Sequence, residues 1–375
     1  MDNKRIAEVF PPGEFIKEEL EARNWNQNEL AEIIGYPASV ISNLIIGKRQ
    51  ITPEIAKALG EAFGTSAQYW MNLESSYQLW KTKDVDSFIS RRSKLYQIAP
   101  IKEMVKRHWI ESSENIDVME NRVKSFFGIN NLDERIHFDH AARKSSSEAT
   151  PAQIAWIFRA KQLAFGVSAK PFSEQSFDDC LIRLRQYLHN TQEIRHVPRT
   201  LAEHGIRFLV LEHLPHTKID GAVFWLDKKS PVVVLSLRYD RIDAFWHTLA
   251  HELGHIKNKD GLKNDGVLDI DLVGDDAQPI ELKLDIEAKA DAFAVNFLIN
   301  QSELTNLIAR VRPLYGAHKI SGFAERIKVH PGIVVGQLQY RKEVPYSSFR
   351  PMLDKVRSVI IPSALTDGWG QQVSI

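Results

Sequence analysis

Apolar and polar positions in the first 80 residues alternate with the period of short amphipathic helices, and tight turns separate these helices. Asn26 is a good N-cap and Glu29 stands three residues later, as in a capping box, so we predict a helix that begins near Gln27. Gly35 supplies the left-handed residue that ends this helix. Pro37 is expected at the first position of the next helix.

The second of these helices buries Ile41, Leu44 and Ile45, which share one face. Its outward positions are small or polar, namely Ala38, Ser39, Ser42 and Asn43. Two such helices that cross steeply form a helix-turn-helix unit, which presents its second helix to the major groove of DNA. The pattern therefore predicts DNA binding by the N-terminal part of the chain.

The rest of the chain begins with residues 81–200, which are mostly helical in pattern and carry no catalytic motif. From about residue 201 the pattern changes to short β-like runs, GIRFLVLE, DGAVFWLD and PVVVLSL, with turn residues between them. We interpret these runs as an antiparallel sheet edge that leads into further helices. The predicted fold class is mainly α with a small β-sheet (α+β).

A helix predicted after Leu237 contains the pattern His-Glu-x-x-His, formed by His251, Glu252 and His255. Residues four apart share a helix face, so both imidazoles can bind one metal ion while Glu252 lies beside the open coordination position. Two histidines and a carboxylate are a ligand set of catalytic zinc, which keeps a water and lowers its pKa toward about 7. In this interpretation Glu252 is the catalytic base that takes a proton from the water and passes it to the leaving amine.

A second helix, predicted over IELKLDIEAKADAFAVNFLIN, offers the missing ligand. Glu287 stands 32 residues after His255 and can complete the metal site. Asp291, four residues further on the same face, can bond the free nitrogen of a ligand histidine and fix its tautomer. The Asp-rich stretch at 258–276 lacks the spacing of a calcium loop, and we expect it to form a mobile rim of the cleft. The alternative is a histidine pair on a helix surface without a metal.

The composition limits the function classes. The 375 residues are too many for one ordinary core and suggest two or three domains. The 48 Lys and Arg residues balance 48 Asp and Glu residues, so any DNA contact must be local. The single cysteine, Cys180, excludes an internal disulfide framework. The start lacks a signal-like apolar run, and no stretch approaches the roughly 18 apolar residues of a membrane span, so we expect a cytoplasmic protein without membrane contact.

The charges are distributed unevenly along the chain. Residues 1–80 contain 7 basic and 11 acidic side chains, a net charge of −4. Residues 81–200 contain 20 and 15, a net charge of +5, and residues 201–375 contain 21 and 22, a net charge of −1. Since the predicted DNA-binding part is acidic, we expect a modest, salt-sensitive DNA affinity that depends on dimerisation.

Residues 11–80 resemble the lambda-repressor-type helix-turn-helix domain of HigA-type antitoxins, in the Xre family. The resemblance lies in the PGE start, the QxxLAxxxG turn and the ending GKRxITPEIAxxLxxAFGTSxxYWxNLxxxYxLW. It implies a homodimer that binds palindromic operator DNA. It assigns a phosphate contact to Gln27 and groove-facing positions to Ser39, Ser42 and Asn43. Lys48 and Arg49 match the loop that contacts the DNA backbone.

The sequence departs from this family at Pro37 and Ala38, where relatives often carry Ser and a basic or polar residue. Neither residue can make a bidentate contact to a base edge, so we expect weak sequence readout. The alternative is a helix-turn-helix fold that serves only as a dimerisation or docking module.

The motifs HTLAHELGH and EAKADAFAVNFLI resemble the ImmA/IrrE family of zinc metallopeptidases, as do the preceding runs GIRFLVLE and IDGAVFWL. The resemblance implies a zincin-like domain at 201–345, followed by a C-terminal extension at 346–375. It assigns Zn²⁺ to His251, His255 and Glu287 and catalysis to Glu252. The alternative is a degenerate site that holds no metal.

The predicted organisation is a DNA-binding domain at 1–80, a helical connector at 81–200 and the metallopeptidase domain. The expected function is that of an antitoxin-type transcriptional regulator whose metallopeptidase domain cleaves or senses a partner protein, such as a toxin or a repressor. In the alternative, the protein is a non-enzymatic type II antitoxin or repressor whose peptidase-like domain only binds metal, ligand or partner. Glu252 favours the enzyme, because a structural zinc site needs no base beside an open position.

Overall fold

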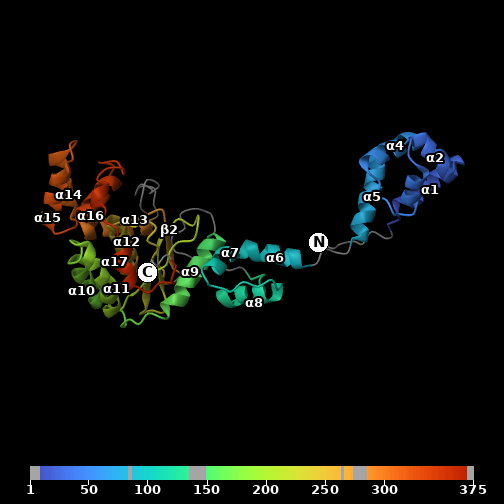
Figure 1. The fold of residues 1–375 in the computed structure, drawn as a ribbon. Coiled ribbons are helices and arrows are strands. Elements are labelled where there is room, and N and C mark those ends of the chain that lie inside the picture. The colour runs from blue at the N-terminus through green and yellow to red at the C-terminus, as the bar shows by residue number, and fades with distance from the viewer. Residues whose placement is uncertain (1–8, 83–86, 135–148, 263–265, 273–284, 370–375) are drawn as a thin grey trace, which may run out of the picture. The chain divides into compact units, whose positions relative to one another are not determined.

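The structure is a computed structural model that describes residues 9–82, 87–134, 149–262, 266–272 and 285–369 (Figure 1). The chain divides into two compact units, Met1–Ser90 and Arg91–Ile375. Within the described ranges, no helix combines the length and the apolar character that a membrane crossing requires.

Short helices around one apolar core make up the first unit. They are α1 (Pro12–Arg23), α2 (Gln27–Ile34), α3 (Ala38–Ile45), α4 (Pro53–Phe63) and α5 (Ala67–Lys81). The side chains at the centre of the core have no exposed surface and come from all five of these helices: Ile16, Leu30, Ile41, Leu59 and Trp70. The helical fold predicted for this part of the chain is therefore confirmed.

The turn between α2 and α3 has the predicted local structure. Asn26 Oδ1 accepts hydrogen bonds from the backbone N–H groups of Asn28 and Glu29 at 2.9 and 3.0 Å. The Glu29 carboxylate accepts one from the backbone N–H of Asn26 at 2.6 Å. This capping box starts α2 at Gln27, as predicted. Gly35 ends α2 with a φ of 68°, in the left-handed region that favours glycine.

One detail of α3 differs from the prediction. Pro37 is the N-cap, with a ψ of 142°, and the helix begins at Ala38. An N-cap residue keeps an extended ψ while its carbonyl accepts the first helical hydrogen bond, so Pro37 lies just outside the helix. Ile41, Leu44 and Ile45 are buried, as predicted.

Helices on both sides of one small sheet form the second unit. Its α-helices in the described ranges are α6 (Ser87–Ile98, which crosses the division between the units), α7 (Ile101–Lys106), α8 (Ile116–Phe127), α9 (Pro151–Ala164), α10 (Glu174–Arg185), α11 (Val197–Glu203), α12 (Ile242–Asn258), α13 (Asp285–Leu298), α14 (Gln301–Val311), α15 (Ala317–Ile327), α16 (Pro331–Tyr340) and α17 (Arg357–Ile360). Its strands and short 3₁₀ helices are β1 (Arg207–Val210), β2 (Ile219–Trp225), β3 (Pro231–Leu235), β4 (Val267–Ile270), η1 (Thr191–His196), η3 (Arg350–Met352) and η4 (Ile361–Ser363).

The sheet has the strand order β1-β3-β2-β4. β2 pairs antiparallel with β3 and with β4, whereas β1 pairs parallel with β3. The expectation of an antiparallel sheet was therefore wrong for β1. The hairpin of β2 and β3 returns β3 to a position between β1 and β2, and because β2 runs opposite to β1 in the sheet, the returning β3 is parallel to β1. The sequence pattern predicted the first three strands but not β4.

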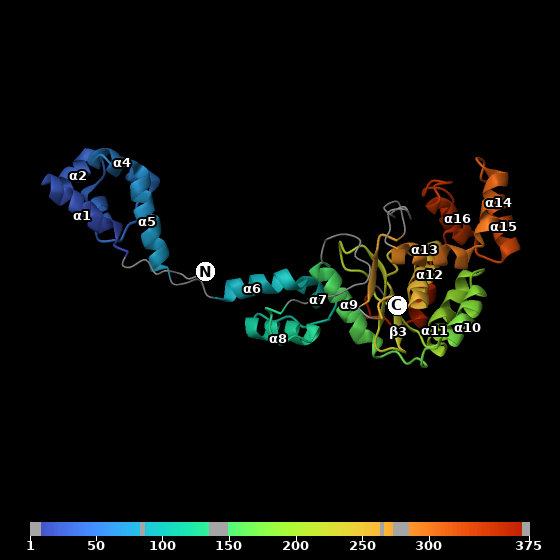
Figure 2. The same ribbon diagram turned by 180° about the vertical axis from the view of Figure 1, so that it is seen from behind.

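Both faces of the sheet are buried. Phe208, Val223 and Val233 point to one face and pack in the same apolar cluster as Trp246 of α12. The alternate positions of the strands, such as Val234, are buried on the other face. α12 packs against β2, β3 and α13, and Figure 2 shows α12 and α13 side by side. The sheet and α13 therefore enclose α12.

The range 81–200, predicted as a connector, contributes helices to this same unit. α9 packs against β1, and so does α11, which begins within this range. Arg107 donates hydrogen bonds to the carbonyl oxygens of Glu212 and His213, both at 2.6 Å. Contacts divide the chain after Ser90 rather than at residue 200.

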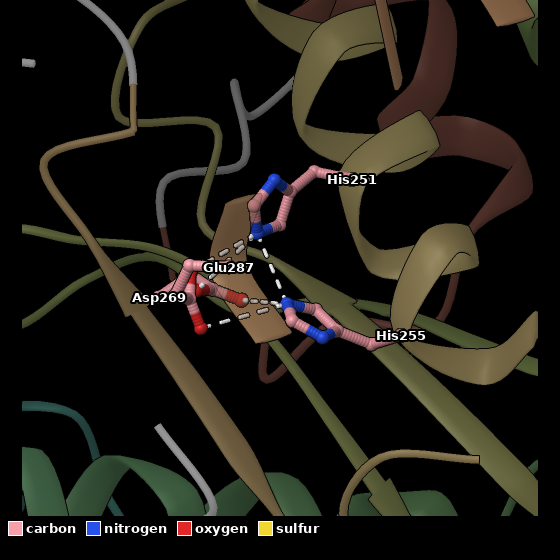
Figure 3. A group of neighbouring side chains, drawn as sticks. All are labelled: His251, His255, Asp269 and Glu287. Atoms are coloured by element: carbon pink, nitrogen blue, oxygen red, sulfur yellow. Dashed lines mark hydrogen bonds and ion pairs between the residues drawn. The ribbon is translucent and has the colours of Figure 1, made fainter. Parts of the chain in front are cut away.

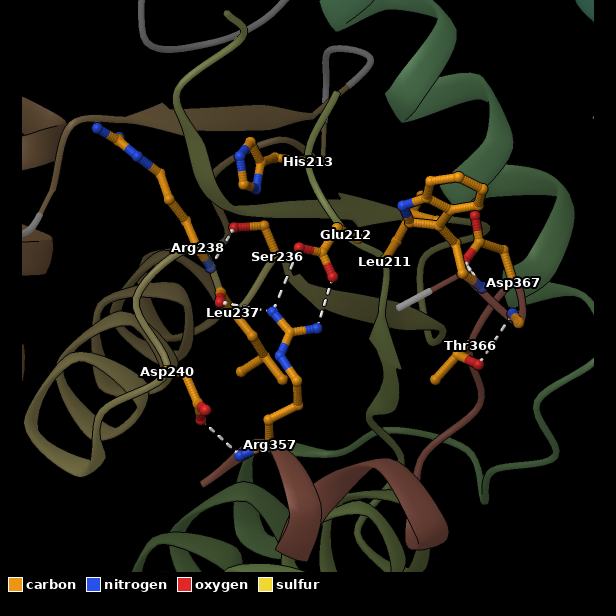
Figure 4. A network of polar contacts seen from close by, with 12 residues as sticks. Leu211, Glu212, His213, Ser236, Leu237, Arg238, Asp240, Arg357, Thr366 and Asp367 are labelled. Carbon is orange, nitrogen blue, oxygen red and sulfur yellow. Dashed lines mark hydrogen bonds and ion pairs between the residues drawn. The ribbon is translucent and has the colours of Figure 1, made fainter. Parts of the chain in front are cut away.

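The C-terminal segment also packs on the sheet. The backbone N–H of Val210 donates to the carbonyl of Leu365 at 3.0 Å. Arg357 pairs with Glu212 at 2.5 Å and donates to the carbonyl of Leu237 at 3.1 Å (Figure 4). These bonds fix the segment beside the strand ends that precede α12.

Candidate functional site

α12 holds His251, Glu252 and His255 in the interior of the second unit. Nearly all of its residues are buried between the sheet, α13 and α16. α13 can approach closely because Gly254 has no side chain, and a Cβ there would lie 3.0 Å from the Cα of Ala290. Polar groups on such a helix need partners inside the protein, because burying them unpaired costs free energy.

Four side chains from three elements meet in one buried cluster (Figure 3): His251 and His255 of α12, Asp269 of β4 and Glu287 of α13. The two histidine Nε2 atoms lie 3.0 Å apart. His251 Nε2 lies 3.3 Å from a Glu287 oxygen and 3.5 Å from an Asp269 oxygen. The corresponding distances from His255 Nε2 are 3.8 and 3.6 Å. The cluster joins the predicted residues His251, His255 and Glu287 and adds Asp269.

These separations fit a divalent metal ion. Ligand atoms about 2.0 to 2.2 Å from a tetrahedral metal lie roughly 3.3 to 3.6 Å from one another. The distances that involve the histidine Nε2 atoms are 3.0 to 3.8 Å, and all four ligand atoms lie within 4.8 Å of one another. Imidazole and carboxylate groups are the ligands of zinc and similar metals. Both oxygens of Glu287 and Oδ2 of Asp269 are buried and accept no hydrogen bond from the described residues. A bound cation would satisfy these oxygens.

The outer nitrogens of both histidines lie against carboxylates. Asp291 Oδ1 is 2.8 Å from Nδ1 of His251. Asp260 Oδ2 is 3.0 Å from Nδ1 of His255. A carboxylate at Nδ1 keeps the proton there and leaves the Nε2 lone pair free to bind a metal. Asp291 therefore lies where the sequence placed it, and Asp260 provides the same contact for the second histidine.

The balance of buried charge also favours a cation. Glu252, Asp269, Glu287 and Asp291 bring four buried carboxyl groups to two imidazoles. Burial acts to lower the pKa of His251, but the surrounding acids outweigh it and raise that pKa well above its usual range. Uncompensated buried charge is costly, so the acids that attract a proton to this imidazole would also attract a metal ion.

Glu252 lies beside this cluster and is fully buried. Neither carboxylate oxygen accepts a hydrogen bond from the part of the chain that the structure describes. Gly221 of β2 leaves room for the group, since a Cβ there would lie 2.0 Å from Glu252 Oε1. Burial, followed by the charge of Asp269, raises the pKa of Glu252 well above its usual range. A buried carboxyl group beside two imidazoles and two further acids is a candidate for proton transfer.

Sequence reasoning did not identify Asp269 and Asp260. Both belong to the stretch expected to form a mobile rim, of which residues 263–265 and 273–276 lie outside the described part. Residues 267–270 instead form β4, and Asp260 follows the end of α12. The available signal was an acidic residue inside the apolar run VLDI, but its inward direction depends on the pairing of β4 with β2.

The residues predicted to contact DNA belong to the first unit. They lie at the start of α2, on α3 and in the loop after α3: Gln27; Ser39, Ser42 and Asn43; Lys48 and Arg49. Ser42 and Asn43 are half-buried and the others are exposed. The backbone N–H groups of Lys48 and Arg49 donate to the carbonyl of Asn43 at 2.9 and 3.0 Å, which fixes the loop at the end of α3. Among the described residues neither cation has an acidic partner, so both are available to phosphates.

Comparisons with known proteins concern the N-terminal part. The helix-turn-helix family model matches residues 16–70. An HTH-type transcriptional regulator of Escherichia coli K12, YddM, is 36% identical over 84 residues, which are 22% of this chain and 89% of the relative. Antitoxin HigA-1 of Vibrio cholerae is 34% identical over 73 residues, which are 19% of this chain and 69% of the relative.

Two similar solved structures include DNA. Pseudomonas aeruginosa antitoxin HigA with the higBA promoter is 33% identical and covers 20% of this chain and 82% of its own, with a TM-score of 0.19. PA4674 of the same organism, in complex with its operator DNA, is 26% identical and covers 29% and 98%, also with a TM-score of 0.19. These scores are low, so the similarity rests on sequence identity. None of these comparisons supports a fusion to an ImmA/IrrE-type peptidase domain, which stays a prediction.

Proposed function

Because the chain belongs to the helix-turn-helix transcriptional regulators through its N-terminal unit, we propose that it is an antitoxin-type DNA-binding regulator that carries a zinc-dependent peptidase site in its second unit. The site would cleave a regulatory partner protein.

The DNA-binding part of the proposal is operator recognition by a homodimer. The relatives described with a promoter or an operator support it, as do the exposed cations of the loop after α3. A two-fold dimer would present two copies of α3 to a palindromic site. The relative named as an antitoxin makes a toxin the first partner to test.

The observation that carries the peptidase part is the fully buried Glu252 carboxylate, whose oxygens accept no hydrogen bond from the described residues. His251, His255 and Glu287 would hold the metal ion. When bound, the ion would supply Lewis acidity toward a peptide carbonyl and toward water. Glu252 would take the proton of the attacking water and deliver it to the leaving amine, because it lies beside the cluster and is not one of the candidate ligands.

Two further carboxylates position the histidines in this mechanism. Asp291 and Asp260, at 2.8 and 3.0 Å, would hold the protons on the Nδ1 atoms of His251 and His255. This contact fixes the imidazole rings and their tautomers, so that both Nε2 atoms face the cluster. Removing such a carboxylate commonly weakens metal binding or activity by about 10- to 100-fold.

One observation favours the non-enzymatic alternative. Asp269 gives the cluster a fourth protein ligand, and structural zinc sites are closed by four protein ligands. In that case the second unit would bind metal only to stabilise or sense a conformation. The peptidase requires Glu252 for peptide cleavage, whereas the non-enzymatic metal site has no catalytic role for this residue.

The experiment compares Glu252→Gln with native protein, and with Glu303→Gln as a control that makes the same change on the exposed surface of α14. Each chain is loaded with zinc, and the metal content is measured. Cleavage is then followed on a library of extended, quenched-fluorescent peptides, in both the native and the Asp269→Ala background. We expect one zinc per chain throughout, and cleavage slowed about 100-fold or more only by Glu252→Gln.

The peptidase proposal fails if zinc is stoichiometric but no peptide in either background is cleaved faster with Glu252 than with Gln. That result would leave the non-enzymatic regulator.

A further inference from the structure

The cluster is closed to solvent. The exposed fractions of His251, His255 and Glu252 are 0%, and those of Glu287 and Asp269 are 1% and 2%. A peptide carbonyl cannot reach a site with this burial, so one of the elements around it must give way before a substrate can enter.

β4 is the element whose contacts make it the candidate. Among the described strands it is an edge strand that pairs only with β2, whereas α12 and α13 are long helices packed against each other. Asp269 lies opposite Gly221 in the register of the β2–β4 pair. Gly221 is also the residue whose missing side chain makes room for Glu252. The Asp269 carboxylate therefore enters the cluster from the sheet edge, on the side of the proposed base.

We propose that β4 occupies the place of the substrate, an inference that rests on the proposed peptidase function. When β4 leaves, an extended peptide pairs antiparallel with β2 in the position of β4. Until then, Asp269 fills the fourth position of the metal site. An extended peptide commonly binds in this way, because an uncovered edge strand offers main-chain hydrogen bonds along its length.

The buried residues of β4 indicate which side chains the substrate peptide would carry. Val267 and Leu268 are buried, at 0% and 6% exposure, and lie opposite Val223 and Ala222 of β2. A segment that replaces β4 would therefore place two apolar residues directly before the residue at the cluster.

A permanent four-ligand site would not explain Glu252. Such a site has no use for a fully buried carboxylate that accepts no hydrogen bond from the described residues, and leaving that group buried is costly. A replaceable Asp269 explains both features, because the base and the three remaining ligands are ready when the strand leaves.

The first test uses the cobalt-substituted full chain and acetohydroxamate, a small metal-binding probe, with visible absorption as the readout. Asp269→Ala and Asp269→Asn open the fourth position. Asp285→Ala removes an exposed carboxylate at the start of α13 and serves as the control. We expect both Asp269 variants to retain one cobalt per chain and to bind acetohydroxamate at least about tenfold more tightly than the native and control chains.

The second test asks whether a peptide takes the place of the strand. In the Asp269→Ala background, Ala222→Cys and Leu268→Cys introduce a disulfide between residues that are opposite in the β2–β4 register. The probe is Val-Leu-Gly hydroxamate. We expect the reduced form to bind it at least about tenfold more tightly than the oxidised form, in which β4 cannot leave.

Equal acetohydroxamate affinity in native and Asp269→Ala chains would overturn the proposal. So would loss of cobalt from both Asp269 variants, because Asp269 would then be an indispensable ligand. Equal peptide affinity in the oxidised and reduced forms would show that β4 does not occupy the place of the substrate. None of these measurements requires cleavage, so failure of the peptidase proposal remains a separate result.

Discussion

At the scale of single residues, Asp220 is a buried carboxylate of β2 that is not one of the four clustered residues His251, His255, Asp269 and Glu287. It accepts a hydrogen bond from the backbone N–H of Leu272 at 2.7 Å and lies 3.7 Å from Arg238. Burial nevertheless raises its pKa to about 7, from a usual value of 3.8. Because the folded state holds this proton more tightly than the unfolded state, the contribution of Asp220 to stability is complete below about pH 4 and is lost as the pH rises through 7.

We therefore predict that Asp220→Asn removes part of the pH dependence of unfolding. Between pH 5 and pH 8 the native chain should lose roughly 2 to 3 kcal/mol more stability than the variant, measured by urea unfolding. Asp227→Asn is the control, because the pKa of that exposed carboxylate is lowered and the group stays ionised over this range. Parallel curves for native and Asp220→Asn chains would contradict the prediction.

The site also shows which residues a sequence can predict. His251, Glu252 and His255 follow from helical spacing alone, because residues four apart share a face. The pair of Glu287 and Asp291 follows from the same rule on a second helix. Asp269 reaches the cluster only through pairing between strands that lie far apart in the chain, and no local period encodes such a pairing.

At the scale of elements, local signals predict the start and end of α2 closely. The capping box and Gly35 act within a few residues, so their geometry is fixed by the sequence nearby. The helices α12 and α13 were likewise expected from their patterns. The direction of β1 relative to β3 was not, because it depends on where the β2–β3 hairpin inserts.

The capping box of α2 leads to a prediction about this element. Asn26→Ala removes the side chain that accepts from two backbone N–H groups, and it should destabilise the helix by about 1 kcal/mol. The matched control is Asn28→Ala, which makes the same substitution inside the first turn. Hydrogen exchange of α2 amides in the full chain should accelerate about fivefold in Asn26→Ala alone. Equal protection in both variants would show that the cap contributes no stability.

At the scale of the whole molecule, the formal charge does not favour the proposed DNA binding, because DNA is anionic and the chain has no excess of basic residues. The net charge is zero, and residues 1–80 carry 7 basic against 11 acidic side chains. An acidic module repels the DNA backbone at long range, so the phosphates must be held by a few local cations. The loop after α3 supplies two of them without acidic partners among the described residues, Lys48 and Arg49.

This arrangement makes the salt dependence of binding the most direct test of the DNA interface. We predict that Lys48→Ala/Arg49→Ala weakens binding of the full chain to DNA from upstream of its own reading frame, measured by fluorescence anisotropy between low and moderate salt. The slope of log affinity against log salt should fall by about one for each phosphate that the variant no longer binds. Lys17→Ala/Lys57→Ala removes two cations from other helices of the same unit and should lower the affinity less, with a nearly unchanged slope.

If both double variants behave alike, net charge alone sets the affinity and the loop after α3 has no special role. If neither changes binding, the acidic N-terminal unit does not hold DNA through these cations, and its helix-turn-helix serves for dimerisation or docking.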